Sequence, residues 1–447
     1  MSQPSADTIF NSINPWVEQQ TGQRLSNIEH IVLQACWDDA RQTYKEIATQ
    51  YRYSLSYIQH RVAPCLWRRL SAAAGTKITK NNFKTVLIQQ LANADRDRVS
   101  SSSAGVEPSP TVLASVLEFP DGPVPPNSAF YVRLLPGEQR YYQALQRPGA
   151  LLRIKGAWRM GKSSLVNQLM ASAQQQGYQT VSLNFQQLER SQLSDLNRLL
   201  RWLCTVLSKK LNLPAALDDY WDEDMGLKSS ATAYLECHVL KQLEQPLVLA
   251  LDDVSELFPY TEVSREFFTM LRTWYEYTKS NANWSKLRLI LSQSSETYIK
   301  LDTNQSPFNV GVRLELKGMS PAKVQELLGR YPLTLSEAQL TQLLTLVGGH
   351  PYLIRLAFYH LARQDLTFDQ LLATAATHEG VFAHHLQHYL WVLQKQPELA
   401  EAIQQVLAAP EPVTLPQMLG FKLQSMGLVT LVQNTAQMSC LLYQDYF

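Results

Sequence analysis

The chain has 447 residues, of which 45% are hydrophobic, and its 40 basic and 39 acidic side chains give a net charge of +1. A chain of this length is expected to form about three domains with cores of their own, which excludes a wholly disordered protein. The near balance of charge excludes a global field that attracts nucleic acid or acidic membranes, so such binding would need a local patch.

The five cysteines lie far apart without CxxC spacing, which favours reduced, buried thiols over a disulfide scaffold or a zinc ribbon. The N-terminus lacks the basic segment and the apolar segment of a secretory signal. No apolar run approaches the ~20 residues that span a bilayer. We therefore expect a soluble, cytoplasmic protein that makes no membrane contact.

Residues 1–94 predict a small all-α domain, in which residues 43–71 fit a helix-turn-helix with Ser54 as the N-cap of the second helix. Residues 24–94 carry ten basic and four acidic side chains, a local net charge of +6. Such a surplus is the electrostatic footprint of a DNA-binding module. Pro64, however, should interrupt the recognition helix. An adaptor domain that binds a protein partner, or that mediates self-association, is therefore the alternative.

A linker is predicted at residues 95–128, where four successive serines and six prolines disfavour helices and sheet ladders. Beyond it, longer helical stretches separate short apolar runs at 151–155, 180–185, 246–251 and 287–291. This alternation predicts an α/β fold in which helices cover both faces of a parallel sheet. Residues 319–376 are helical in pattern, and residues 377–447 combine helices with a small hairpin.

The segment Gly156–Ser163, GAWRMGKS, matches the phosphate-binding pattern GxxxxGK[ST] in full, between a strand-like run and a helix-like run. Its backbone amides and the helix N-terminus would hold phosphate oxygens. Lys162 would reach the β- and γ-phosphates, and the Ser163 hydroxyl would ligate Mg²⁺. The residues predicted to contact a nucleotide here are Gly156, Arg159, Met160, Gly161, Lys162, Ser163 and Ser164.

Two further strand ends carry polar residues. The apolar run 246–251 ends in Asp252-Asp253, as a Walker B strand does. Asp252 would hold Mg²⁺ through water, and Asp253 stands where a carboxylate polarises the attacking water. The run 287–291 is followed by Ser292-Gln293, and we predict that Ser292 or Gln293 senses the γ-phosphate, a plain polar turn being the alternative. The candidate catalytic residues are thus Lys162, Asp253 and Ser292, and the candidate metal ligands are Ser163 and Asp252.

Three motifs together resemble the STAND class of P-loop ATPases, relatives of AAA+ proteins: GAWRMGKS, LVLALDD at 247–253 and GGHP at 348–351. More closely, residues 118–447 resemble the AAA-like domain of bacterial multidomain signalling proteins, and the N-terminal segment resembles the vWA-MoxR-associated helix-turn-helix domain. The resemblance implies a P-loop ATPase core at 129–318, a helical lid at 319–376 and a winged helix at 377–447. It also implies ATP or ADP with Mg²⁺ as ligands, with Pro351 packing near the base.

In that family the segment before the first strand lines the adenine side, which makes Phe130, Tyr131 and Arg133 candidates here. Of the family's GRxxE-like core, only Arg133 and Glu138 are present. The implied function is a signalling switch in which ATP and ADP favour different conformations or oligomers. Asp253 in place of the commoner glutamate predicts slow ATP hydrolysis, because the shorter carboxylate reaches less far toward water. The alternatives are a DNA-binding AAA+-like regulator or loader, and a pseudo-ATPase that only binds nucleotide.

Overall fold

The computed structural model describes residues 117–135, 137–222, 224–294 and 306–447. In the N-terminal part it describes residues 17, 25, 27–38, 43–50, 58–74, 78–80, 83–84 and 86–87. The chain separates into two compact units, Met1–Pro110 and Thr111–Phe447, with separate hydrophobic cores. No helix in these described ranges is long and apolar enough to cross a membrane.

The N-terminal unit is helical, as the sequence predicts. It contains α2 (Asn27–Asp38), α3 (Tyr44–Gln50), the π-helical η1 (Ile58–Val62) and α5 (Ala63–Ala74). The fully buried Leu33, Ile47 and Leu66 share one core. Pro64 is the second residue of α5, so the predicted interruption coincides with the change from π- to α-helical backbone. Ser54 lies outside the described residues.

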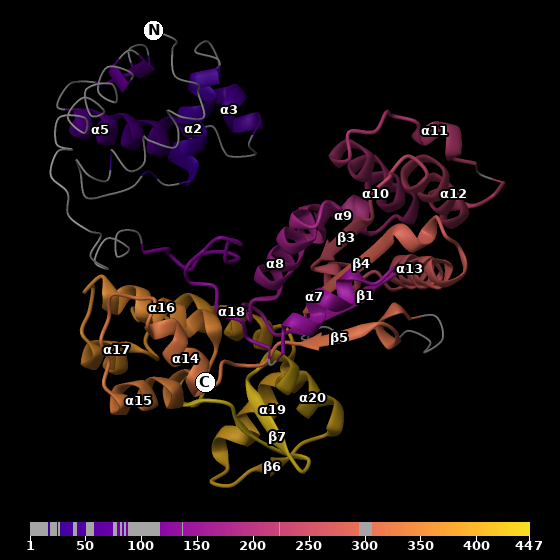
Figure 1. Cartoon of the computed structure of the whole chain (residues 1–447). Helices are drawn as coiled ribbons and strands as arrows, with labels where there is room; N and C mark the ends of the chain where they lie inside the picture. The colour runs from indigo at the N-terminus through magenta and orange to yellow at the C-terminus, as the bar shows by residue number, and fades with distance from the viewer. Residues whose placement is uncertain are drawn as a thin grey trace, which may run out of the picture. The chain divides into compact units, whose positions relative to one another are not determined.

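The second unit is built on a five-stranded parallel sheet of order β2-β3-β4-β1-β5 (Figure 1). Its strands are β1 (Leu151–Gly156), β2 (Gln179–Asn184), β3 (Leu247–Asp252), β4 (Leu287–Ser294) and β5 (Val312–Glu315). The four predicted apolar runs form β1 to β4, which confirms the α/β fold class. Strand β5 was not predicted from the sequence, because a four-residue edge strand with alternating charged residues, VRLE, has no apolar run.

Helices cover both faces of this sheet. Alternate residues of β3 enter different cores: Val248 and Ala250 pack with α7 (Gln139–Gln146) and α8 (Lys162–Gln175), whereas Leu247, Leu249 and Leu251 pack with α10 (Leu196–Lys210) and α13 (Thr261–Ser280). The remaining elements between β2 and β5 are η3 (Phe185–Gln187), α9 (Arg190–Leu193), α11 (Leu217–Tyr220), α12 (Leu227–Ala233), η4 (Tyr234–Leu240), η5 (Val254–Leu257), η6 (Trp284–Lys286) and η7 (Pro307–Asn309).

The chain after β5 folds into helices and a small sheet that share one hydrophobic core, and Figure 1 shows the two groups, orange and yellow, side by side. The first group is α14 (Pro321–Leu328), α15 (Glu337–Val347), α16 (Pro351–Ala362) and α17 (Phe368–Thr374). The second is α18 (Ala383–Gln394), α19 (Pro397–Ala408), β6 (Val413–Thr414), α20 (Gln417–Met426), β7 (Val429–Val432), β8 (Thr435–Met438) and α21 (Leu441–Tyr446). The three helices α18 to α20 and the antiparallel sheet of order β6-β8-β7, whose first strand precedes α20, correspond to the predicted winged helix.

Candidate functional site

The loop between β1 and α8 adopts a conformation suited to an anion. Lys162 is the first residue of α8, and Gly161 before it has a φ of +90°, which side chains rarely allow. Arg159 also has a positive φ, +57°. The first backbone N–H groups of a helix have no partners inside the helix, and they carry its positive dipole end. The loop therefore offers several backbone donors to one oxyanion.

Lys162 is 7% exposed, and its ammonium donates a hydrogen bond of 2.9 Å to the Ala157 carbonyl on the same loop. Two residues further on, the Ser164 hydroxyl accepts a 2.9 Å hydrogen bond from the Val124 N–H. Gln168 of α8 also donates to the Pro126 carbonyl at 3.2 Å. Part of the predicted linker, within residues 117–128, is therefore held against α8 by hydrogen bonds.

The two acids at the end of β3 differ in their surroundings. Asp252 is 5% exposed, and its Oδ1 accepts from the Asp253 N–H at 3.1 Å. Asp253 has a φ of +54°, uncommon for a residue with a side chain, and its Oδ2 accepts from the Asn184 amide at 3.3 Å. Burial, reinforced by the negative charge of Asp252, raises the pKa of Asp253 to about 6, although Lys162 opposes the shift.

Asn184 was not predicted from the sequence. It is the last residue of β2 and lies in register with Asp252, so the polar ending of β2 beside the acidic ending of β3 was the available signal.

Ser292 does not reach the pocket described below. It is completely buried in β4, in register with Ile154, and its hydroxyl has no hydrogen-bond partner among the described residues. The strand continues to Ser294, which is in register with Gly156 and donates its N–H to the Ser255 hydroxyl at 3.1 Å. The apolar run ends at residue 291, but the strand does not, so the polar tip lies farther along than the sequence indicates.

A pocket of about 360 Å³ lies beside the loop and brings most of the predicted residues together. Its lining consists of Arg159, Gly161, Lys162, Ser163, Ser164, Asn184, Gln186, Asp253, Pro351, Tyr352, Arg355, Trp158 and residues 120–124. Gly156, Met160 and Asp252 do not line it. We call this the phosphate pocket.

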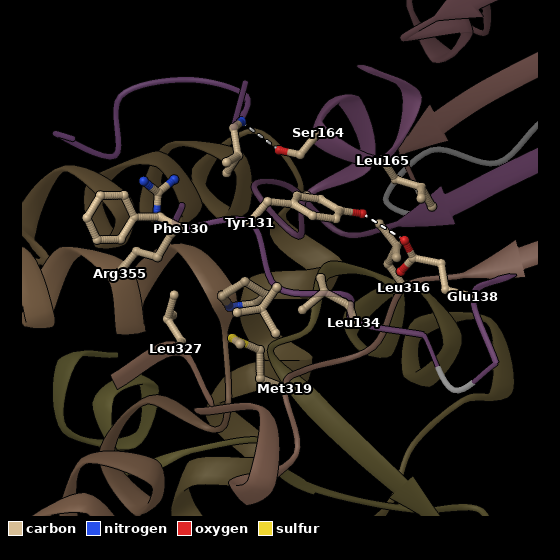
Figure 2. Close-up of a pocket in the computed structure, with 14 residues that line it drawn as sticks. Phe130, Tyr131, Leu134, Glu138, Ser164, Leu165, Leu316, Met319, Leu327 and Arg355 are labelled. Atoms are coloured by element: carbon tan, nitrogen blue, oxygen red, sulfur yellow. Dashed lines mark hydrogen bonds between the residues drawn. The ribbon is translucent and has the colours of Figure 1, made fainter. Parts of the chain in front are cut away.

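A second, smaller pocket lies next to the first, and five residues line both: Val124, Gly161, Ser164, Pro351 and Arg355. Most of its other walls are apolar, as Figure 2 shows, and come from segments far apart in the chain. They are Phe130, Tyr131, Val132, Leu134, Glu138, Leu165, Leu316, Met319 and Leu327. We call this the base pocket. Of the three residues predicted here, Phe130 and Tyr131 line it, whereas the guanidinium of Arg133 lies 5.9 Å from the Tyr142 ring centre.

The GGHP motif packs against the chain that follows β5. Gly348 and Gly349 have positive φ values, and a Cβ on Gly349 would lie 2.6 Å from the Met319 carbonyl, so only glycine fits. The Met319 N–H donates to the Gly349 carbonyl at 2.7 Å. This turn starts α16 at Pro351, which lines both pockets. Arg355, one turn later, is 8% exposed and also lines both, and no motif identified it beforehand.

Aromatic rings join the loop to the lid and to the winged helix. The Trp158 ring stacks on His388 of α18, with ring centres 3.8 Å apart, and on His385 at 5.4 Å. The Arg159 guanidinium lies 4.4 Å from the Trp158 ring centre and 4.1 Å from that of Tyr352 on α16. Two variable residues of the loop thus contact both C-terminal groups of helices.

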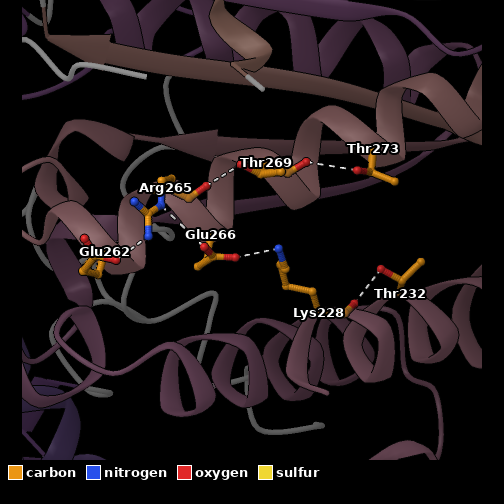
Figure 3. A network of polar contacts seen from close by, with 7 residues as sticks. All are labelled: Lys228, Thr232, Glu262, Arg265, Glu266, Thr269 and Thr273. Carbon is orange, nitrogen blue, oxygen red and sulfur yellow. Dashed lines mark hydrogen bonds and ion pairs between the residues drawn. The ribbon is translucent and has the colours of Figure 1, made fainter. Parts of the chain in front are cut away.

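The segment after Asp253 leads through η5 into α13, and α13 is attached to α12 by polar contacts (Figure 3). Lys228 of α12 pairs with Glu266 at 2.6 Å, and Arg265 reaches Glu262 and Glu266 at 2.5 and 3.5 Å. The Trp274 indole donates to the Thr232 hydroxyl at 2.9 Å. Each exposed ion pair contributes less than about 1 kcal/mol, so the network orients α13 more than it stabilises the fold.

This fold and loop place the chain among P-loop nucleotide-binding proteins. Its sequence matches the AAA-like domain over residues 119–447, most of its length, and the chain belongs to that family. Residues 5–90 match the vWA-MoxR associated protein N-terminal HTH. A comparison with curated proteins gave no significant match.

Solved structures similar to this chain include the Walker-type ATPase of Pyrococcus abyssi, with 14% identity over 69% of this chain and 93% of that chain, at a TM-score of 0.49. The ORC2 protein of Aeropyrum pernix has 13% identity over 70% and 92%, at 0.39. AMPPCP-bound DnaA from Aquifex aeolicus has 15% identity over 67% and 80%, at 0.35.

Proposed function

We propose that the protein is an ATP-dependent switch of the STAND type. It binds ATP or ADP with Mg²⁺ between the P-loop and the lid, and the nucleotide sets the arrangement of lid and winged helix. The observation that carries this proposal is that the phosphate pocket and the base pocket lie side by side and share wall residues. A triphosphate fits the first, beside Lys162 and the N-terminus of α8, and a planar base fits the second.

The residues of the phosphate pocket have distinct roles in this proposal. Lys162 exchanges its bond to the Ala157 carbonyl for the β- and γ-phosphates, and the backbone of Arg159 and Gly161 supplies further donors. Ser164 holds the segment that covers the pocket. Ser292, completely buried, supports no contact to the γ-phosphate.

The donor set beside the phosphate pocket fits Mg²⁺, which prefers oxygen ligands and keeps part of its water shell. The Ser163 hydroxyl would bind the ion directly, and the Asp252 carboxylate would hold it through water. When bound, the ion neutralises charge on the phosphates.

Asp253 is the residue best suited to orient and deprotonate a water molecule. It lines the phosphate pocket and, with a pKa of about 6, is ionised at neutral pH. The bond from Asn184 and the short side chain both restrain its reach, so we expect slow hydrolysis. The alternative is a pseudo-ATPase that binds nucleotide without hydrolysing it. ATP hydrolysis by the wild-type chain that is lost in D253N would reject this alternative.

Calorimetry with Mg·ATP and Mg·ADP tests the binding step, and size-exclusion chromatography with light scattering in ADP and in a non-hydrolysable ATP analogue tests the switch. We expect binding of both nucleotides and a nucleotide-dependent mass or elution volume. Absence of heat with either nucleotide would refute the site assignment.

A DNA-binding regulator is the second candidate, supported by the net charge of +6 in residues 24–94. Several of those cations have partners within the unit: Arg69 pairs with Glu29 at 2.9 Å, Lys84 donates to the Trp37 carbonyl, and Lys80 lies 5.1 Å from the Tyr44 ring centre. The winged helix adds no positive charge that would attract DNA, because residues 377–447 carry two lysines and five acids. We therefore favour a protein partner or self-association through the N-terminal unit. Salt-dependent binding to duplex DNA would reverse this preference.

A further inference from the structure

A third pocket, of about 450 Å³, uses a different part of the P-loop from the phosphate pocket. Gly156, Ala157 and Met160 line this third pocket, and none of them lines the phosphate pocket. Its remaining walls come from the chain around the end of β5, the GGHP turn and the winged helix. We call it the junction pocket. Its volume lies in the range of roughly 300–1,000 Å³ that is typical of small-molecule sites.

Three charged side chains line the junction pocket, and two of them are lysines, Lys155 and Lys317. The third is Glu315 of the edge strand β5, in register with Lys155 of β1. Glu315 is already paired with Arg313 of its own strand at 2.7 Å. The half-buried Lys155, in contrast, makes no hydrogen bond or ion pair with another described residue. The carboxylate in the wall therefore leaves the pocket with a surplus of positive charge.

The burial of Lys155 makes this surplus important. Burial lowers the pKa of its ammonium, although the negative charge of Glu315 opposes the shift. A partly desolvated cation without a partner is costly, and an anion that reaches it gains a charge-assisted hydrogen bond. His350 also lines the pocket, but burial lowers its pKa to about 4, so it is neutral at pH 7. The pocket is thus suited to a negatively charged group.

The winged helix contributes an uncharged wall. Val429, Thr430 and Leu431 of β7 line the junction pocket, together with Gln424 of α20. These residues offer apolar surface beside a hydroxyl and an amide, which can donate and accept hydrogen bonds. Such a wall fits the uncharged body of a ligand whose charged group lies at the lysines.

We propose that the junction pocket is a second ligand site, for a small organic anion whose phosphate or carboxylate group binds Lys155 and Lys317. The uncharged body of this ligand lies against β7. The inference goes beyond the proposed nucleotide site and does not depend on it. Because the ligand contacts the sheet and the winged helix at once, its binding favours the arrangement in which the two meet.

The test is calorimetry on the full chain in excess Mg·ADP, with three probes of similar shape. They are 1-naphthyl phosphate, 1-naphthoate and the neutral 1-naphthalenemethanol. We expect at least one of the two anions to bind at least about tenfold more tightly than the alcohol, since only an anion gains from the lysines. The tighter of the two anions identifies whether the site prefers a phosphate or a carboxylate.

Two variants locate the site. K155M removes the charge and keeps an unbranched side chain, so the advantage of the anion over the alcohol should fall below about threefold. T430W keeps every charge and fills the pocket from the exposed Thr430, and should weaken binding of the anion at least about tenfold. K422M is the matched control, because it removes a lysine of α20 that does not line the pocket, and should bind the anion as the wild-type chain does.

Hydrogen exchange tests the effect on the winged helix. The amides of β7 should exchange more slowly when the tighter anion is bound to the wild-type chain, and T430W should show no such change. Unchanged exchange in a chain that binds the anion would refute the claim that the ligand holds the sheet and the winged helix together.

Equal affinity of the wild-type chain for all three probes would overturn the proposal, whether or not the variants fold. Binding of the anion that is lost in K162A and kept in K155M would also overturn it, because the anion would then lie in the phosphate pocket. A chain that fails to bind Mg·ADP refutes the nucleotide site instead, and the comparison of K155M with K422M still decides this proposal.

Discussion

The phosphate pocket and the base pocket differ in how the chain builds them. The phosphate pocket takes its backbone donors and its lysine from one loop, Trp158–Ser164, and its polar residues from the ends of β2 and β3, while residues 120–124 and the first turns of α16 complete its wall. The base pocket is assembled from the segment before α7, the first turns of α8, the chain after β5 and the lid. Chemistry that needs backbone donors is encoded locally, whereas an apolar surface is encoded only by the tertiary fold.

The largest expected effect on the phosphate pocket alone comes from K162A. Loss of the ammonium beside the γ-phosphate should weaken ATP binding at least about 100-fold, close to 3 kcal/mol, and the fold should persist. Displacement of labelled ADP measures this. K323A, which removes a partly exposed lysine on α14 that pairs with Glu326 at 2.7 Å and lines neither pocket, is the control and should bind normally.

D253N separates chemistry from binding. It should remove ATP hydrolysis, measured as phosphate release, and leave ADP affinity within about threefold of wild type. In the wild-type chain we expect hydrolysis to rise with pH through about 6, as Asp253 loses its proton. A wild-type rate that is flat between pH 5 and 7.5 would contradict the assignment of Asp253 as the base.

The same variant should stabilise the nucleotide-free chain. The pKa of Asp253 is raised from 3.8 to about 6, so the folded state binds more protons than the unfolded state in that window. Wild-type stability therefore falls as the pH rises from about 4 to 6, and at pH 7.5 the ionised carboxylate costs about 1–3 kcal/mol. Urea denaturation at pH 7.5 should show D253N more stable by that amount, with little difference at pH 4.

F130A removes part of the wall of the base pocket. Phe130 lines the base pocket and packs on Tyr331 with ring centres 4.5 Å apart. Its truncation should weaken ATP and ADP equally, by about tenfold, because in the proposed site the ring would contact the base and not the phosphates. A loss confined to ATP would place Phe130 in the phosphate half instead.

S164A gives the smallest effect and touches both halves, since Ser164 lines both pockets. Removal of its bond to the Val124 N–H should cost about 1 kcal/mol and weaken all nucleotides about three- to fivefold. S172A, on the same helix but away from both pockets, should leave binding unchanged.

The contrast between the halves also explains which inferences the sequence supported. The P-loop was visible because its chemistry requires glycine and lysine at a fixed spacing, and β1 to β4 were visible as apolar runs. Arg355 and Leu316 carry no local pattern, since their roles depend on the lid folding back over α8. Ser292 was predicted to lie at the tip of the strand because the sequence shows where an apolar run ends. It does not show where the backbone hydrogen bonds between strands end.

The stack of Trp158 on His388 has a consequence for whatever engages the C-terminal region. An object that draws α18 away must first separate these two rings, and so disturbs the loop that carries Lys162. Coupling of this kind is reciprocal. If a partner that binds the winged helix changes the affinity for nucleotide by some factor, nucleotide changes the affinity for that partner by the same factor. The nucleotide affinity of the P-loop would therefore report whether a partner is bound to the winged helix.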